Sequence, residues 1–125
     1  MATDPEFLDH VLDLFSGMGP IATGRMFSGS ALYVEGDVMF ACILGDRVWL
    51  KSDAATEPTF RAAGSEPFSY EKAAGRMQVT SLMSLPDDAA DDADAALTWG
   101  RLALGPARAA AEKKRAAKAR KAAKG

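Results

Sequence analysis

Five short segments of the chain combine β-branched, aromatic and aliphatic residues in the manner of β-strands. They are residues 23–27, 32–34, 38–44, 48–50 and 77–83. Polar segments that contain glycine, residues 35–37 and 45–46, separate the central three. Gly45 suits the first position of a two-residue type II′ turn, because glycine takes a positive φ without steric strain. This pattern predicts an antiparallel β meander of about five strands.

Helical spacing of apolar residues predicts helices before and after this sheet. Asp4 and Pro5 are typical of a helix start, because the aspartate accepts a hydrogen bond from a free first-turn amide and proline has no amide to leave unpaired. Apolar residues then recur at helical spacing until Gly17 ends the helix. A short helix capped by Asp53 and a final helix beginning at Pro86 follow later in the chain.

Two further stretches are predicted to interrupt the regular structure, and the second marks the end of the folded domain. Residues 65–76 are rich in turn-forming residues and are predicted to form turns. Gly105 and Pro106 are expected to end the final helix, because proline lacks an amide and clashes with the preceding turn. We assign residues 1–105 to an α+β domain of two layers, an antiparallel sheet packed with amino- and carboxy-terminal helices. Residues 106–125 are assigned to a separate basic tail.

Charge is distributed unevenly between the domain and the basic tail. The domain has seven basic and sixteen acidic residues, a net charge of −9, whereas the tail has eight basic residues and one acid, a net charge of +7. The eight basic residues are Arg108, Lys113, Lys114, Arg115, Lys118, Arg120, Lys121 and Lys124. Such asymmetry points to a polyanionic partner, so we take these eight as candidate contacts to DNA phosphates.

Alanine, lysine and arginine make up almost the whole basic tail, and all three favour helix. The tail has no large apolar residue and therefore no evident face to bury. An isolated helix of this length is marginal in water, and like charges four residues apart, such as Lys114 and Lys118, weaken it. We expect a disordered segment that becomes helical when it binds a polyanion.

No catalytic, cofactor or metal site is expected from the sequence. Residues 17–22 match the Gly-x-Gly-x-x-Ala spacing of dinucleotide-binding loops, but they follow a predicted helix instead of a strand. The lone histidine, His10, and the lone cysteine, Cys42, are interpreted as a boundary residue and a buried apolar residue. The five aspartates within residues 87–94 lack the glycine and glutamate of a calcium loop and suit a helix start. We therefore predict a non-enzymatic protein without a cofactor.

The chain also lacks the patterns that direct proteins to membranes. No apolar run approaches the roughly 20 residues needed to span a bilayer. The amino terminus has neither the basic nor the apolar region of a signal peptide. We expect a cytoplasmic protein without a membrane partner.

The central part of the chain resembles a known family. The residues that carry the resemblance are Arg25-Met26-Phe27-Ser28-Gly29-x-Ala31-Leu32-Tyr33-x-x-Gly36-x-x-Met39-Phe40-Ala41, Leu50-Lys51-Ser52-Asp53, residues 60–64, Pro67-Phe68-Ser69-Tyr70, and Trp99 with Ala103-Leu104. Over residues 5–105 the chain is similar to the TfoX/Sxy amino-terminal domain family. The resemblance implies an α+β domain without catalytic residues. It also implies a role in transcription, since the family is named after bacterial competence regulators that act with a cyclic-AMP receptor protein.

Two functions fit these observations. The first is a regulatory protein that binds a protein partner in transcription and contacts DNA through its basic tail; in the free protein, tail and acidic domain would pair as a weak autoinhibitory contact. The alternative is a protein–protein adaptor or homodimer whose tail is a solubilising extension. Arg25, Lys51 and Tyr70 lie within the family motifs and are candidates for a small anionic ligand. Each also fits a structural role, as a salt-bridging edge residue or a half-buried aromatic anchor.

Overall fold

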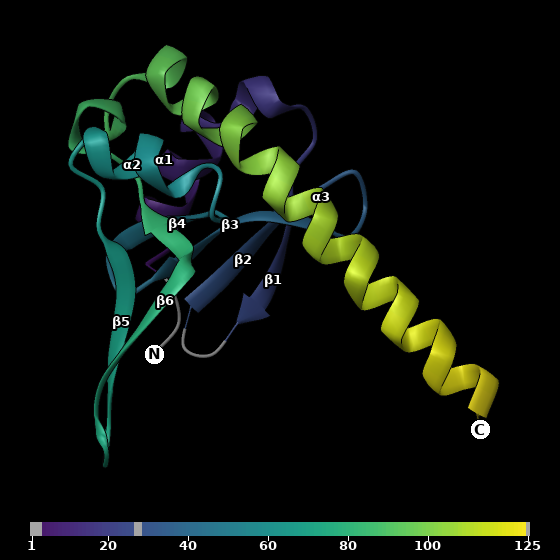
Figure 1. Cartoon of the computed structure of the whole chain (residues 1–125). Coiled ribbons are helices and arrows are strands. Elements are labelled where there is room, and N and C mark those ends of the chain that lie inside the picture. Colours follow the sequence, from purple (N-terminus) through teal and green to yellow (C-terminus); the bar gives the residue numbers. More distant parts are fainter. Residues whose placement is uncertain (1–3, 27–28, 125) are drawn as a thin grey trace.

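The computed structural model describes residues 4–26 and 29–124 (Figure 1). Its helices are α1 (Pro5–Leu14), the 3-10 helix η1 (Ser16–Met18), α2 (Glu57–Ala62), the 3-10 helix η2 (Asp87–Ala89) and α3 (Ala93–Lys124). Its strands are β1 (Ala22–Met26), β2 (Gly29–Val34), β3 (Val38–Leu44), β4 (Arg47–Lys51), β5 (Pro67–Lys72) and β6 (Gly75–Ser84). The predicted α+β class is thereby confirmed.

All six strands belong to one antiparallel sheet with the order β1-β2-β3-β4-β6-β5. The five predicted strands correspond to β1, β2, β3, β4 and β6, although Phe27, at the end of the first, lies outside the described residues. Gly45, in the turn between β3 and β4, has a φ of 65°, as its predicted role requires. The central meander therefore forms as its sequence pattern indicates.

β5 is the strand that the sequence analysis missed. It lies within residues 65–76, where only turns were predicted, and forms a hairpin with β6. Pro67 at its start obscured the pattern, but β5 is an edge strand, where a missing amide is tolerated. β5 joins the sheet by antiparallel pairing with β6, and the Phe68 ring packs on the Trp49 ring, with the centroids 5.1 Å apart.

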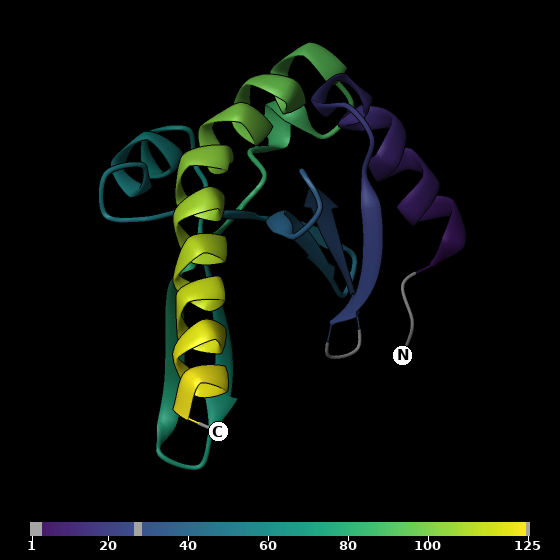
Figure 2. The same cartoon turned by 90° about the vertical axis from the view of Figure 1, so that its right-hand side faces the viewer.

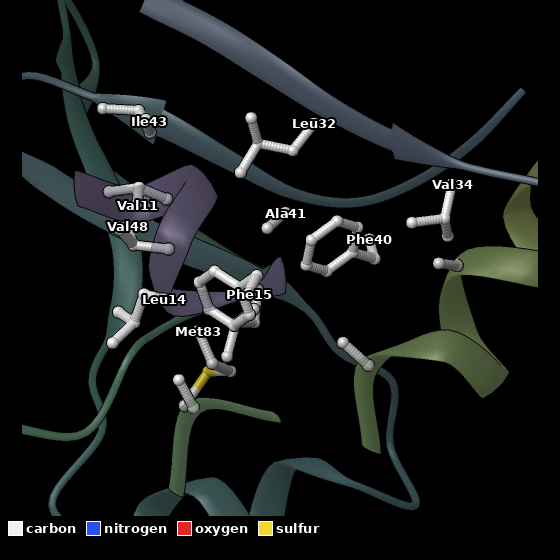
Figure 3. Packing of buried hydrophobic residues seen from close by; sticks show 14 of the residues in the cluster. Val11, Leu14, Phe15, Leu32, Val34, Phe40, Ala41, Ile43, Val48 and Met83 are labelled. Carbon is white, nitrogen blue, oxygen red and sulfur yellow. The ribbon is translucent and has the colours of Figure 1, made fainter. Parts of the chain in front are cut away.

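The main core lies between one face of the sheet and the helices α1 and α3 (Figure 3). Val11, Leu14 and Phe15 point from the amino-terminal helix and the residue after it toward the sheet. The Phe15 and Phe40 rings meet edge to face, with centroids 5.4 Å apart. These contacts confirm the predicted apolar face of the first helix and hold the sheet against it.

A smaller cluster lies apart from this core. Its buried members are Cys42, Trp49 and Leu82, and Phe68 is one of the partly buried residues that pack against it. Burial raises the pKa of the Cys42 thiol to about 11, which agrees with its interpretation as a buried apolar residue. The hairpin of β5 and β6 projects well beyond the other strands of the sheet (Figure 1).

Aspartates cap the helices, but not always where the sequence indicated. Asp4 accepts a hydrogen bond from the Glu6 amide at 3.3 Å, as predicted. Asp53 accepts from amides of the turn before α2, but the N-cap of α2 is Thr56, so the predicted cap of this helix at Asp53 is wrong. The final helix does not begin at Pro86, because the short helix η2 intervenes; Asp92 instead accepts from the Asp94 amide at 3.0 Å and starts α3.

The predicted break at Gly105 and Pro106 is wrong. α3 continues through both residues to Lys124, and Figure 2 shows it bending partway along its length. Pro106, Ala107 and Ala111 are buried, so the first part of the basic tail does have a face to bury. Packing of these small residues against the protein offsets the hydrogen bond and the steric fit that proline takes from a helix.

Candidate nucleic-acid interface

Two arginines of α3 bind acids in the turn between β2 and β3. Arg108 donates from Nε to Oε1 of Glu35 at 2.9 Å, and a second bond joins its Nη2 to Oε2. Arg115 donates from Nε to Oδ2 of Asp37 at 2.7 Å and from Nη2 to Oδ1 at 3.2 Å. Seven residues, close to two helical turns, separate the arginines, so both reach the same turn. We call Glu35, Gly36 and Asp37 the acidic turn.

The backbone of the acidic turn sets these carboxylates toward the helix. Glu35 has a φ of 54°, and it is the one residue other than glycine with a positive φ among those described. Gly36, with a φ of 90°, follows it. A left-handed conformation at both residues matches the twist of a tight hairpin.

The two ion pairs shift the pKa values of all four groups. The hydrogen bonds from Arg108 and Arg115 lower the pKa of Glu35 and of Asp37 below the usual carboxyl range. The same bonds raise the pKa of each arginine. The side chains are about half exposed, so salt screens the pairs and their contribution to stability is small.

The other described cations of the basic tail lie on the exposed part of α3. Lys113, Lys114, Lys118, Arg120 and Lys121 are exposed and take part in no ion pair within the described residues. The side chain of Lys124 is outside the described part of the chain. The end of α3 extends away from the domain and lies far from the β5–β6 hairpin (Figure 1).

The spacing of these cations divides them into two rows on the helix. Lys114, Lys118 and Lys121 are separated by four and three residues and therefore share one side. The first two of these line pockets between α3 and the sheet. Lys113 and Arg120, seven residues apart, form a second row turned away from those pockets. Lys114 and Lys118 thus face the domain, whereas Lys113 and Arg120 face solvent.

The three residues considered for a small anionic ligand do not come together. Arg25 is exposed on the edge strand β1, and Tyr70 is exposed on β5, the opposite edge strand. The Tyr70 ring stacks on Phe68 at 6.2 Å. Lys51, which is half-buried on β4, lines a pocket in the described part of the chain, and there it lies near Lys114.

The structure also describes the surroundings of the lone histidine and of the glycine-containing residues 17–22. His10 is exposed, and its Nε2 atom lies 3.0 Å from the carbonyl oxygen of Ala90. Residues 17–22 lead from η1 into β1, so no strand precedes them as a dinucleotide-binding loop would require. No described helix has a stretch that is long and apolar enough to cross a bilayer.

Sequence reasoning missed the partners of the basic residues. Glu35 and Asp37 flank a glycine in a predicted turn. The only signal in the sequence was their negative charge, which is opposite to the charge of the basic tail. Tyr33 and Met39 form part of the wall near Lys51, although the sequence indicated them only as strand residues. These contacts depend on how α3 crosses the sheet, which the predicted helix break concealed.

Comparison with known proteins agrees with this architecture. No curated protein matches the chain. The model of the TfoX N-terminal domain matches residues 13–107, which include all six strands and the first part of α3. The match covers most of the chain, and the chain therefore belongs to the TfoX N-terminal domain family.

Proposed function

We propose that this protein is a non-enzymatic regulator in transcription whose basic tail contacts DNA phosphates without reading sequence. The observation that carries the proposal is the exposed part of α3, where five described cations lie on a helix that extends from an acidic domain. A preformed cationic helix meets a polyanion without first losing the conformational entropy of a disordered segment.

Contacts of this kind provide affinity but little sequence specificity. The basic tail has no asparagine, glutamine or aromatic residue, and these are among the side chains that read base edges or stack on bases. Release of counterions from DNA gives a logarithmic salt slope of about −0.9 for each phosphate neutralised. Five free cations therefore predict a slope of about −4.5.

The acidic turn adds an autoinhibitory element to this proposal. Glu35 and Asp37 occupy Arg108 and Arg115, two of the eight candidate contacts. DNA phosphates would compete with these carboxylates, and the net charge of −9 on the domain would oppose close approach of DNA. A protein partner that binds the acidic turn would release both arginines for DNA.

The test is a fluorescence-anisotropy titration of a labelled random duplex at several salt concentrations. In the full-length chain, the triple variant Lys113→Gln, Arg120→Gln and Lys121→Gln should reduce the slope from about −4.5 to about −1.8. The matched control replaces three exposed cations of the domain, Arg25, Lys72 and Arg101, with glutamine. Equal slopes for the two variants, or no binding by the native protein at low salt, would contradict the proposal.

The adaptor or homodimer is the second candidate, and the β5–β6 hairpin favours it. This hairpin projects from the domain (Figure 1). It carries Tyr70 and Met77, which are 38% and 42% exposed. Exposed apolar side chains on a projecting arm suit a protein contact. Light scattering would test the homodimer. A native dimer that becomes a monomer in the double variant Tyr70→Ser with Met77→Ser would support this function. A native protein that is a monomer would contradict the homodimer.

A further inference from the structure

A pocket lies where α3 passes the strands β2, β3 and β4. Its volume is about 160 Å³, and a second pocket of about 430 Å³ adjoins it along α3. The sheet supplies Tyr33, Met39 and Lys51, and the helix supplies three alanines and Lys114. We call this the Lys51 pocket. The alanines of α3 leave the space open, since larger side chains there would fill it.

Lys51 carries a charge for which no counter-ion is in place. It is half-buried, and no hydrogen bond or ion pair involves its ammonium group among the residues that the structure describes. The one carboxylate in the wall belongs to Asp37, and Arg115 already binds both of its oxygens. Lys51 therefore lines the pocket without a described partner of opposite charge.

A second cation increases this imbalance. Burial lowers the pKa of Lys51, and the positive charge of Lys114 across the pocket lowers it further, although the Cys42 side chain acts in the opposite sense. Lys118 lines the adjoining pocket. Several ammonium groups around a partly apolar space raise the electrostatic free energy unless an anion enters. Methyl groups of Met39 and the alanines also exclude water, which strengthens the attraction for that anion.

We propose that the Lys51 pocket is a binding site for one phosphate group, held between Lys51 and Lys114. Two ammonium point charges match the charge of a phosphate, and their hydrogen bonds suit its several acceptor oxygens. The site rests on the proposed function only for the source of the phosphate. That source is either the DNA backbone next to the cations of α3 or a free small-molecule phosphate.

The test is a titration of the full-length protein with inorganic phosphate, followed by amide NMR signals at constant ionic strength against sodium chloride. We expect saturable shifts at Lys51, Met39 and Ala111. Lys51→Gln and Lys114→Gln should each weaken binding by roughly tenfold or more, because a charge-assisted hydrogen bond is lost. Lys113→Gln is the matched control, because it removes the same charge from the adjacent residue on the outward row.

A second variant guards against a folding defect in Lys51→Gln. Ala110→Leu fills the pocket from α3 and leaves both lysines in place, so phosphate binding should be lost with the charge unchanged. Signals that follow ionic strength alone, or equal shifts in the native protein and in Lys51→Gln, would overturn the proposal. The titration contains no DNA, so its outcome is independent of whether the basic tail binds a duplex.

A short duplex then identifies the source of the phosphate. If the duplex displaces inorganic phosphate and shifts Lys51, the site holds a backbone phosphate of DNA. If Lys51 responds only to inorganic phosphate, the site takes a free phosphate, and the phosphate site stands without the duplex. If Lys51 responds to neither, the proposed site is wrong.

Discussion

The two parts of α3 differ in what holds them helical. Up to Ala111 the helix has a stripe of small buried residues, Ala96, Gly100, Ala103, Ala107 and Ala111, at spacings of three and four. Beyond Ala111, every described side chain is exposed. Packing stabilises the first part, whereas the second relies on the intrinsic helix preference of alanine, lysine and arginine and on continuity with the first. Packing therefore anchors the first part of α3, and its absence leaves the second part accessible.

The largest effect should follow from placing a charge on the packed stripe. Ala103→Asp buries a carboxylate at a fully buried position without a partner, and we expect a loss of about 4 kcal/mol in the free energy of unfolding. The matched variant Ala119→Asp, on the exposed part, should change it by less than about 0.5 kcal/mol. Urea unfolding measures both. Similar values for the two variants would mean that the halves are not distinct in packing.

Two glycines of α3 sharpen the comparison within the packed part. A methyl group at Gly105 would meet no atom within 4 Å, so Gly105→Ala should stabilise the protein by about 0.5–1 kcal/mol. At Gly100 the same methyl group would lie 2.9 Å from Sδ of Met18 and 3.2 Å from Cδ1 of Phe15. Gly100→Ala should therefore lack this gain. Thermal unfolding of both variants is the measurement, and equal stabilisation would show that the stripe has spare room.

The smallest effect should come from the ion pairs that hold the exposed part near the acidic turn. Because Arg115 lowers the pKa of Asp37, the pair contributes stability above the ordinary carboxyl range and loses it as pH falls through the lowered value. At neutral pH, Asp37→Asn should speed amide exchange of residues 113–121 by less than about fivefold.

The amide exchange rates of the native protein should approach those of Asp37→Asn only in strong acid or at high salt. Asp46→Asn removes an exposed acid from the next turn and is the control. If Asp46→Asn speeds amide exchange as much as Asp37→Asn does, the ion pair does not explain the effect. Hydrogen exchange read by NMR resolves the two parts of the helix in one experiment.

Local patterns were sufficient to predict most of the sheet and the first helix. Apolar runs with glycine between them indicated β2, β3 and β4, and the cap at Asp4 placed the start of α1. In these segments the signal lies in neighbouring residues. The family resemblance was correct for the same reason, since the longest of its motifs lies in the meander.

The missed strand and the missed continuation of α3 depend on contacts between residues far apart in the chain, whereas the start of α3 was misplaced by the local helix η2. β5 forms because Phe68 finds Trp49, and α3 continues through Pro106 because small side chains pack on the sheet. Neither partner can be deduced from the segment itself. The candidate interface was predicted as a set of charges, but its division into paired, pocket-facing and outward cations requires the path of the helix.

The buried thiol of Cys42 can report on local opening of the structure around it. With a pKa of about 11, only roughly one molecule in ten thousand carries the reactive thiolate at pH 7, and the side chain is fully buried. A thiol reagent therefore reaches Cys42 only after the side chains packed around it, among them Trp49 and Leu82, move aside. The rate of alkylation counts those openings in the native protein, without a label and without perturbing the cationic helix.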